Sequence, residues 1–209
     1  MEEVIKEIFS GTYHIENLKK DGVVLVNETT ENPSAVFIGW TNSFQSMKFD
    51  AAIGLLRFDS VENLLRPILK KLQISYPDFG GWTSTLTLFE RVELPEFDKN
   101  NIEMLTEQFS TIKEQLKGIE RDFFDKLISL GAVSEYLGTL NEEQLSERVT
   151  NPVLVRKLVI DTLSGNVADL KGTCNKIANE YEEAEKMYPQ IFNNHNKATR
   201  EVFNVLAIT

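Results

Sequence analysis

Two patterns of hydrophobic and polar positions follow one another along the chain, and the change between them falls near Pro95. Before this residue, short apolar runs rich in β-branched and aromatic side chains alternate with turn residues, which is typical of strands. After it, apolar residues recur at steps of three and four, which is typical of amphipathic helices. The sequence therefore predicts an α+β protein, with a mixed region at residues 1–95 and a mostly α-helical region at residues 96–209, packed together as one unit.

The mixed region is expected to contain about four strands and one or two helices. A short helix is predicted at residues 2–9, before Gly11. The predicted strands are the apolar runs 23–26 and 35–40, separated by a turn at Asn32-Pro33, the alternating segment 47–58, and the segment 82–92. A helix is predicted at residues 61–73, with Ser60 as its N-cap and a kink at Pro67.

The helical region begins with a stripe of apolar residues that predicts one long helix over residues 98–129. The stripe consists of Ile102, Leu105, Phe109, Ile112, Leu116, Ile119 and Phe123. A second stripe runs from Val167 to Tyr188 and stops at Pro189, after which a last helix can continue. The two long helices are expected either to pack antiparallel, as a hairpin or bundle, or to form a homodimer through the Ile102 to Phe123 stripe.

Between these stripes, the segment from Val153 to Leu163 is apolar on nearly every side. It follows Asn151-Pro152, an N-cap residue and a proline suited to the first helical position. A helix that is apolar all round is normally buried. This short helix is therefore predicted to lie in the core.

Charge and cysteine content restrict the classes of function. The net charge of −10 opposes a phosphate backbone, and the local basic groups are Lys19-Lys20 and Lys70-Lys71, with Arg66 one turn before the latter, so direct nucleic-acid binding is not expected. Cys174 is the single cysteine, which excludes an internal disulfide and indicates a reducing compartment, the cytoplasm by default. No segment has the roughly 18 apolar residues of a membrane span, and no membrane association is expected.

Candidate catalytic groups are few. His14 and His195 lie far apart in the sequence without a metal-binding motif around either, and Cys174 lies on the apolar stripe of its helix. There is no glycine-rich phosphate-binding loop. We therefore expect no cofactor and no metal, although an enzyme with a dispersed, acid-based site leaves no local motif and stays an alternative.

Aromatic residues give a more specific indication. Six of them, several beside turn residues, are concentrated in the first half of the chain: Trp40, Phe44, Phe49, Tyr76, Phe79 and Trp82. Because Trp and Tyr are enriched at the centres of protein interfaces, we select Tyr76, Asp78, Phe79, Trp82 and Trp40 as candidate partner-binding residues. The alternative interpretation is that these side chains cover one end of the core.

The function predicted by elimination is protein binding without catalysis. The most concrete form is an inhibitor or immunity-type protein that neutralises an effector or toxin by covering its active surface, and the acidic composition suggests a basic partner. One alternative is an anti-defence protein that mimics nucleic acid. Another is a structural protein that assembles through the helical stripe.

Overall fold

The computed structural model describes residues 1–27, 33–76 and 82–207, and the chain folds into two compact units. Unit 1 comprises Met1–Arg57 and Asp78–Ile128, and unit 2 comprises Phe58–Pro77 and Ser129–Thr209. The predicted α+β class is confirmed. The division differs from the predicted boundary at residue 95, because a helix of the first half belongs to unit 2 and the first helix of the second half packs on the sheet of unit 1.

Unit 1 is built on an antiparallel sheet in the order β1-β2-β3-β4-β5, in which a short β6 also pairs with β4. The strands are β1 (His14–Lys19), β2 (Gly22–Asn27), β3 (Ser34–Asn42), β4 (Ser46–Leu56), β5 (Leu86–Arg91) and β6 (Phe97–Asp98). The four predicted strands correspond to β2, β3, β4 and β5. The turn predicted at Asn32-Pro33, between the first two of these strands, includes Asn32, which lies outside the described residues.

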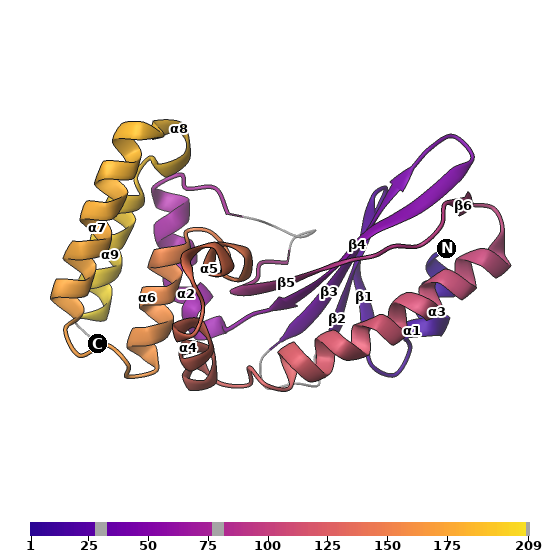
Figure 1. Cartoon of the computed structure of the whole chain (residues 1–209), viewed down its shortest axis with the longest axis horizontal. Helices are drawn as coiled ribbons and strands as arrows, with labels where there is room; N and C mark the ends of the chain where they lie inside the picture. Colours follow the sequence, from indigo (N-terminus) through magenta and orange to yellow (C-terminus); the bar gives the residue numbers. More distant parts are fainter. Residues whose placement is uncertain (28–32, 77–81, 208–209) are drawn as a thin grey trace. The chain divides into compact units, whose positions relative to one another are not determined.

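Two helices, α1 (Glu2–Phe9) and α3 (Ile102–Ile119), lie along one face of this sheet (Figure 1). Most of the predicted stripe is buried there: Leu105, Phe109, Ile112, Leu116, Ile119 and Phe123 are at most 2 % exposed. The helix lies so close to β4 that a Cβ on Gly54 would come within 2.7 Å of Cγ2 of Ile119. The stripe is therefore occupied within unit 1, which leaves these side chains inaccessible to a second chain. Ile102 alone of the seven remains exposed.

The long helix predicted at residues 98–129 is shorter in the structure. It begins after Asn101, whose side chain accepts a hydrogen bond from the amide of Met104. At Ile119 it passes into a π-helical turn, η1 (Glu120–Phe124), which buries both Phe123 and Phe124. A π turn changes the angle between successive side chains, so two adjacent phenylalanines can both be buried.

Unit 2 is helical in the residues that the structure describes. Its helices are α2 (Asp59–Lys71), α4 (Leu130–Gly138), α5 (Glu142–Arg148), α6 (Val153–Leu163), α7 (Leu170–Met187), α8 (Pro189–Phe192) and α9 (His195–Leu206). The helix predicted at residues 153–163 is confirmed as α6, which is largely buried. The stripe that stops at Pro189 forms α7, which lies beside α9 (Figure 1). The predicted hairpin of the two long helices is wrong, because α3 and α7 belong to different units.

A buried ion pair joins α2 to α6 in unit 2. Nε and Nη2 of Arg156 each donate to a different carboxylate oxygen of Glu62 at 2.9 Å, and both side chains are 0 % exposed. Nη1 of Arg156 donates to the carbonyl oxygen of Thr150 at 2.8 Å. The helix predicted at residues 61–73 is thus confirmed in type, although Phe58 is its N-cap and Ser60 lies inside it. Pro67 also lies inside this continuous helix.

Candidate protein-binding surface

Three connections between secondary-structure elements meet at one end of the sheet in unit 1. Nε1 of Trp40 and Nδ2 of Asn42 both donate to the carbonyl oxygen of Lys20, at 3.0 and 2.6 Å, which ties the β1–β2 turn to β3. The amide of Lys99, between β6 and α3, donates to the carbonyl oxygen of Gln45 at 3.2 Å. These bonds fix the β1–β2 turn, the β3–β4 hairpin and the start of α3 relative to one another.

A hollow of about 530 Å³ lies among these connections. Its lining includes three lysines, two aromatic residues and two polar residues: Lys19, Lys20, Lys99, Trp40, Phe44, Asn42 and Ser43. Phe44 lies at the tip of the β3–β4 hairpin and is 91 % exposed. We call Lys19, Lys20, Phe44 and Lys99 the sheet-end surface. Figure 1 shows the β3–β4 hairpin and β6 beside the N-terminus at this end of the sheet.

The sheet-end surface has the opposite charge to the unit that carries it. Unit 1 contains 11 basic and 19 acidic side chains. Even so, Lys19 and Lys20 form no ion pair with any residue that the structure describes. Nζ of Lys99 donates to the carbonyl oxygen of Ser43 at 3.2 Å. Three lysines therefore line the same hollow as an exposed phenylalanine, and none of them has a carboxylate partner in the described part of the chain.

The tryptophans selected from the sequence are both buried in unit 1. Trp40 is 3 % exposed and packs edge-on against Phe109 of α3, while its indole N–H holds the β1–β2 turn as described above. Trp82 is 7 % exposed and packs in a core cluster with Val24 and Leu55. For Trp82 the burial favours the core interpretation. Trp40 lines the sheet-end hollow but exposes little of its side chain to a partner.

The other three selected residues follow α2. Tyr76 is half-buried and lines a second hollow, of about 620 Å³, together with Asn63, Arg66, Pro67 and Lys70. Tyr76 belongs to unit 2, whereas Trp40 and Trp82 belong to unit 1. Asp78 and Phe79 lie outside the described residues, so their prediction is neither supported nor opposed.

The sequence analysis did not select Phe44 and Lys99. A signal for Phe44 is nevertheless present, because it is the one apolar residue in the polar turn Ser43-Phe44-Gln45-Ser46 between two strands. An apolar residue at the tip of a hairpin has no sheet face to cover and is left in solvent. Lys99 has no such signal, because it reaches the surface only through the pairing of β6 with β4.

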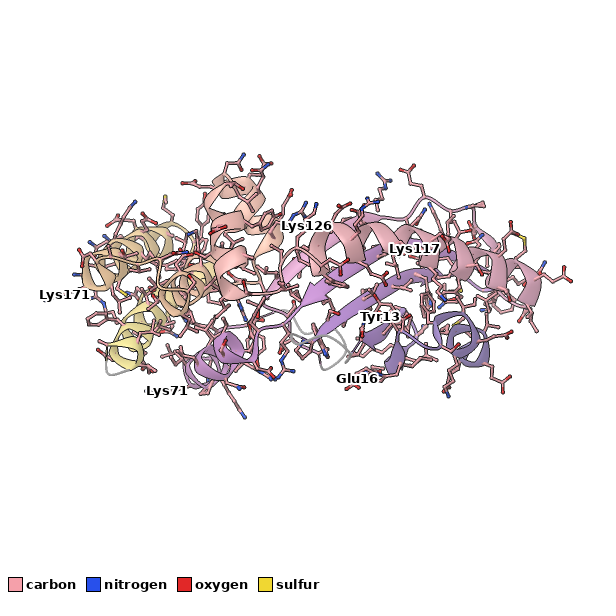
Figure 2. The ribbon with its side chains drawn as sticks, turned by 90° about the horizontal axis from the view of Figure 1, so that it is seen from below. Tyr13, Glu16, Lys71, Lys117, Lys126 and Lys171 are labelled. Atoms are coloured by element: carbon pink, nitrogen blue, oxygen red, sulfur yellow. The ribbon has the colours of Figure 1, made fainter. Side chains whose placement is uncertain are left out.

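Three buried side chains with shifted pKa values, Tyr13, Tyr181 and His195, line neither hollow. Burial raises the pKa of Tyr13, whose hydroxyl donates to Glu120 at 2.7 Å; Figure 2 labels Tyr13 near the helix that carries Lys117. Burial also raises the pKa of Tyr181 to about 12 and lowers the pKa of His195. Each shift is explained by enclosure in a core, and none of these three side chains lines the sheet-end hollow or the α2 hollow.

Within residues 1–27, 33–76 and 82–207, no three His, Cys, Asp or Glu side chains are grouped to hold a metal ion.

Comparisons with protein-family models, with curated proteins and with solved structures found no match to this chain. Among the described residues, no helix has both the length and the apolar character needed to cross a membrane.

Proposed function

We propose that this chain is a non-enzymatic protein-binding protein, an inhibitor that neutralises an effector or toxin in the cytoplasm by covering its active surface, and that the sheet-end surface makes the contact. One observation carries the proposal: a phenylalanine that is 91 % exposed at the tip of a hairpin. Burying a Phe side chain against a partner stabilises a complex by about 2 to 3 kcal/mol. Large aromatic side chains of this kind dominate the energy of many protein interfaces.

The rigidity of the hairpin supports the same role. The amide of Ser43 donates to the carbonyl oxygen of Ser46 at 2.9 Å, and Lys99 bonds to both Ser43 and Gln45 on either side of Phe44. Each side chain or loop that becomes ordered on binding costs about 0.5 to 1.5 kcal/mol. A tip that is already held in place avoids part of this cost, so more of the energy from Phe44 is available for affinity.

The location of the shifted acid–base groups favours binding over catalysis at this surface. Catalytic acids and bases normally combine a shifted pKa with access to a cleft. Tyr13, Tyr181 and His195 have shifted pKa values, but they do not line the sheet-end hollow. The hollow itself offers lysines, an amide and a hydroxyl around an aromatic ring, a set suited to recognition.

Site-specific photo-crosslinking in the cells that produce the protein tests the proposal. A benzophenone amino acid replaces Phe44 in one variant and Phe89 in a matched control; Phe89 is also an exposed phenylalanine of unit 1, 55 % exposed on β5. We expect a discrete protein adduct from position 44 and none from position 89. The activity of the captured protein is then measured with the purified wild-type chain and with Phe44→Ala.

The wild-type chain is expected to suppress that activity, and Phe44→Ala to weaken the suppression about 30-fold, which corresponds to roughly 2 kcal/mol. Phe89→Ala should leave suppression unchanged. Equal labelling from both positions would exclude the sheet-end surface as the contact. An adduct whose activity the wild-type chain does not change would refute the inhibitor role.

A further inference from the structure

Three of the four other exposed lysines of unit 1 form ion pairs with carboxylates three or four residues away: Lys6 with Glu2, Lys117 with Glu114, and Lys126 with Asp122. Lys48 is the exception in the described part of the unit. Such local pairing needs only helical spacing. At the sheet end, the lysines come from two separate connections of the fold. Pairing with a carboxylate three or four residues away in the same helix therefore cannot neutralise them together.

Hydrogen bonds hold the backbone of the segments that carry these lysines. The carbonyl oxygen of Lys20 accepts from both Trp40 and Asn42, which holds the turn that carries Lys19 and Lys20. The ammonium of Lys99 donates to the residue just before Phe44, which brings a positive charge next to the exposed ring. Positive charge and apolar area therefore occur together on one surface about the size of a small ligand site.

A compact acidic peptide segment fits this combination better than a nucleic acid does. Three lysines suit a few carboxylates, and an apolar side chain of the same segment can pack on Phe44. An extended phosphate backbone would run beyond the hollow over a unit with 19 acidic side chains, where it meets repulsion. The net charge of the whole chain suggests a basic partner, whereas the three lysines that line the sheet-end hollow favour an acidic one at this contact.

We infer that the sheet-end surface recognises an acidic segment of a partner protein, with carboxylates on Lys19, Lys20 and Lys99 and an apolar side chain on Phe44. This inference rests on the proposed function and specifies the chemistry of the partner at the same surface.

Titration of the ¹⁵N-labelled full chain, followed by backbone amide shifts, tests the inference. The probe is a capped five-residue peptide with phenylalanine at the centre and two glutamates on each side; the same peptide with lysines and a ten-nucleotide thymidine DNA serve as comparisons. We expect the acidic peptide to shift amides at residues 18–21, 42–45 and 98–100, with binding that weakens as NaCl rises from low to moderate concentration. The lysine peptide should shift none of them.

Two variants, one with a double and one with a single charge reversal, provide the comparison. Lys20→Glu combined with Lys99→Glu should weaken peptide binding at least tenfold, whereas Lys117→Glu, the same change at an exposed lysine of α3 labelled in Figure 2, should leave binding unchanged. Retention of the wild-type spectrum outside the mutated loops shows that each variant is folded. Equal binding of the lysine peptide, equal loss in the Lys117→Glu variant, or tighter binding of the DNA would each overturn the inference.

The two proposals fail separately. If position 44 crosslinks a protein whose activity is suppressed but the acidic peptide does not bind, the inhibitor role stands and the acidic partner is wrong. If the peptide binds at the sheet end but position 44 gives no adduct, the recognition of acidic segments stands and the inhibitor role falls.

Discussion

Removing one partner of the Glu62–Arg156 pair should destabilise unit 2 more than any other single charge removal described here. In Glu62→Leu, two hydrogen bonds of 2.9 Å are lost and the guanidinium remains 0 % exposed, held only by backbone carbonyls such as that of Thr150. A buried charge left without its partner costs about 3 to 5 kcal/mol. The free energy of unfolding of a typical protein is about 5 to 15 kcal/mol, so this loss would be a large fraction of it.

The measurement is urea unfolding followed by circular dichroism at 222 nm, which reports largely on the helices. With a slope of about 1.5 kcal/mol per M urea, the expected loss moves the midpoint down by about 2 to 3 M. Lys71→Ala is the matched control, because Lys71 forms an exposed ion pair with Glu201 at 2.9 Å in the same unit. Exposed pairs contribute about 0 to 1 kcal/mol, so this variant should barely move the midpoint.

A double variant separates the cost of an unpaired charge from the cost of altered packing. Glu62→Leu with Arg156→Met removes both charges and keeps apolar volume at the α2–α6 contact. It should recover most of the stability that either single substitution loses, because no buried charge is left unpaired. If Glu62→Leu costs less than about 1 kcal/mol, or if the two losses simply add, the buried pair does not hold α2 on α6 as argued here.

Two further predictions concern one titrating group and one close contact. Burial lowers the pKa of His195 below its usual 6.5, so as the pH falls the unfolded chain binds the proton before the folded chain does. The free energy of unfolding should therefore be highest above about pH 6.5 and decrease below it, by at most about 1.4 kcal/mol per pH unit. Urea midpoints at pH 7.5 and 5.5 should differ less in His195→Phe than in the wild type. Gly54→Ala should lower the stability of unit 1 by about 1 to 3 kcal/mol because the new Cβ meets Ile119. Gly118→Ala should raise it by up to about 1 kcal/mol, because the added carbon meets nothing within 4 Å outside its own helix backbone and chain neighbours. Both tryptophans belong to unit 1, so thermal unfolding followed by their fluorescence measures both effects, and equal effects would contradict the close packing of α3 on β4.

Elements with a strong internal pattern were predictable from the sequence. The helix at residues 153–163 coincides with α6 because nearly every side chain in it is apolar and a proline precedes it. The alternation in residues 47–58 identified β4, which pairs with β3, β5 and β6. In both elements the pattern is set by burial against many neighbours, so the spacing of apolar positions is enough to predict the type of element.

Elements that depend on a distant partner were not predictable in the same way. β1 has the sequence HIENLK, which contains too few apolar residues to indicate a strand, and it exists because β2 pairs with it from His14 to Lys19. The end of α3 was missed because the apolar stripe continues past Gly118 to Phe123, whereas in the structure a π turn begins at Glu120 and buries Phe124 as well. Local propensity competes with tertiary contacts at such positions, and here the contacts prevail.

The apolar stripe of α3 shows why a correct pattern does not identify the surface that covers it. The residues from Leu105 to Ile119 do form one continuous face, as the spacing predicted. Whether such a face meets a second helix, a sheet or another chain depends on which other apolar face is free, and in unit 1 the sheet carries Gly54 where Ile119 packs against it. The sequence alone contains both faces but not their pairing.

The charge of the chain poses the same problem at the level of function. A net charge of −10 acts over distances at which individual groups are no longer distinguished, but at physiological salt the field of a charge is screened within about 8 Å. A segment bound in the sheet-end hollow, as proposed, would meet Lys19, Lys20 and Lys99 and would be affected only weakly by carboxylates farther than this from the hollow. The basic pair Lys19-Lys20 is visible in the sequence, yet its importance depends on Lys99 and Phe44, which only the folded hairpin and β6 bring beside it. Net charge thus describes how partners approach this protein, and the fold decides which charges they meet on contact.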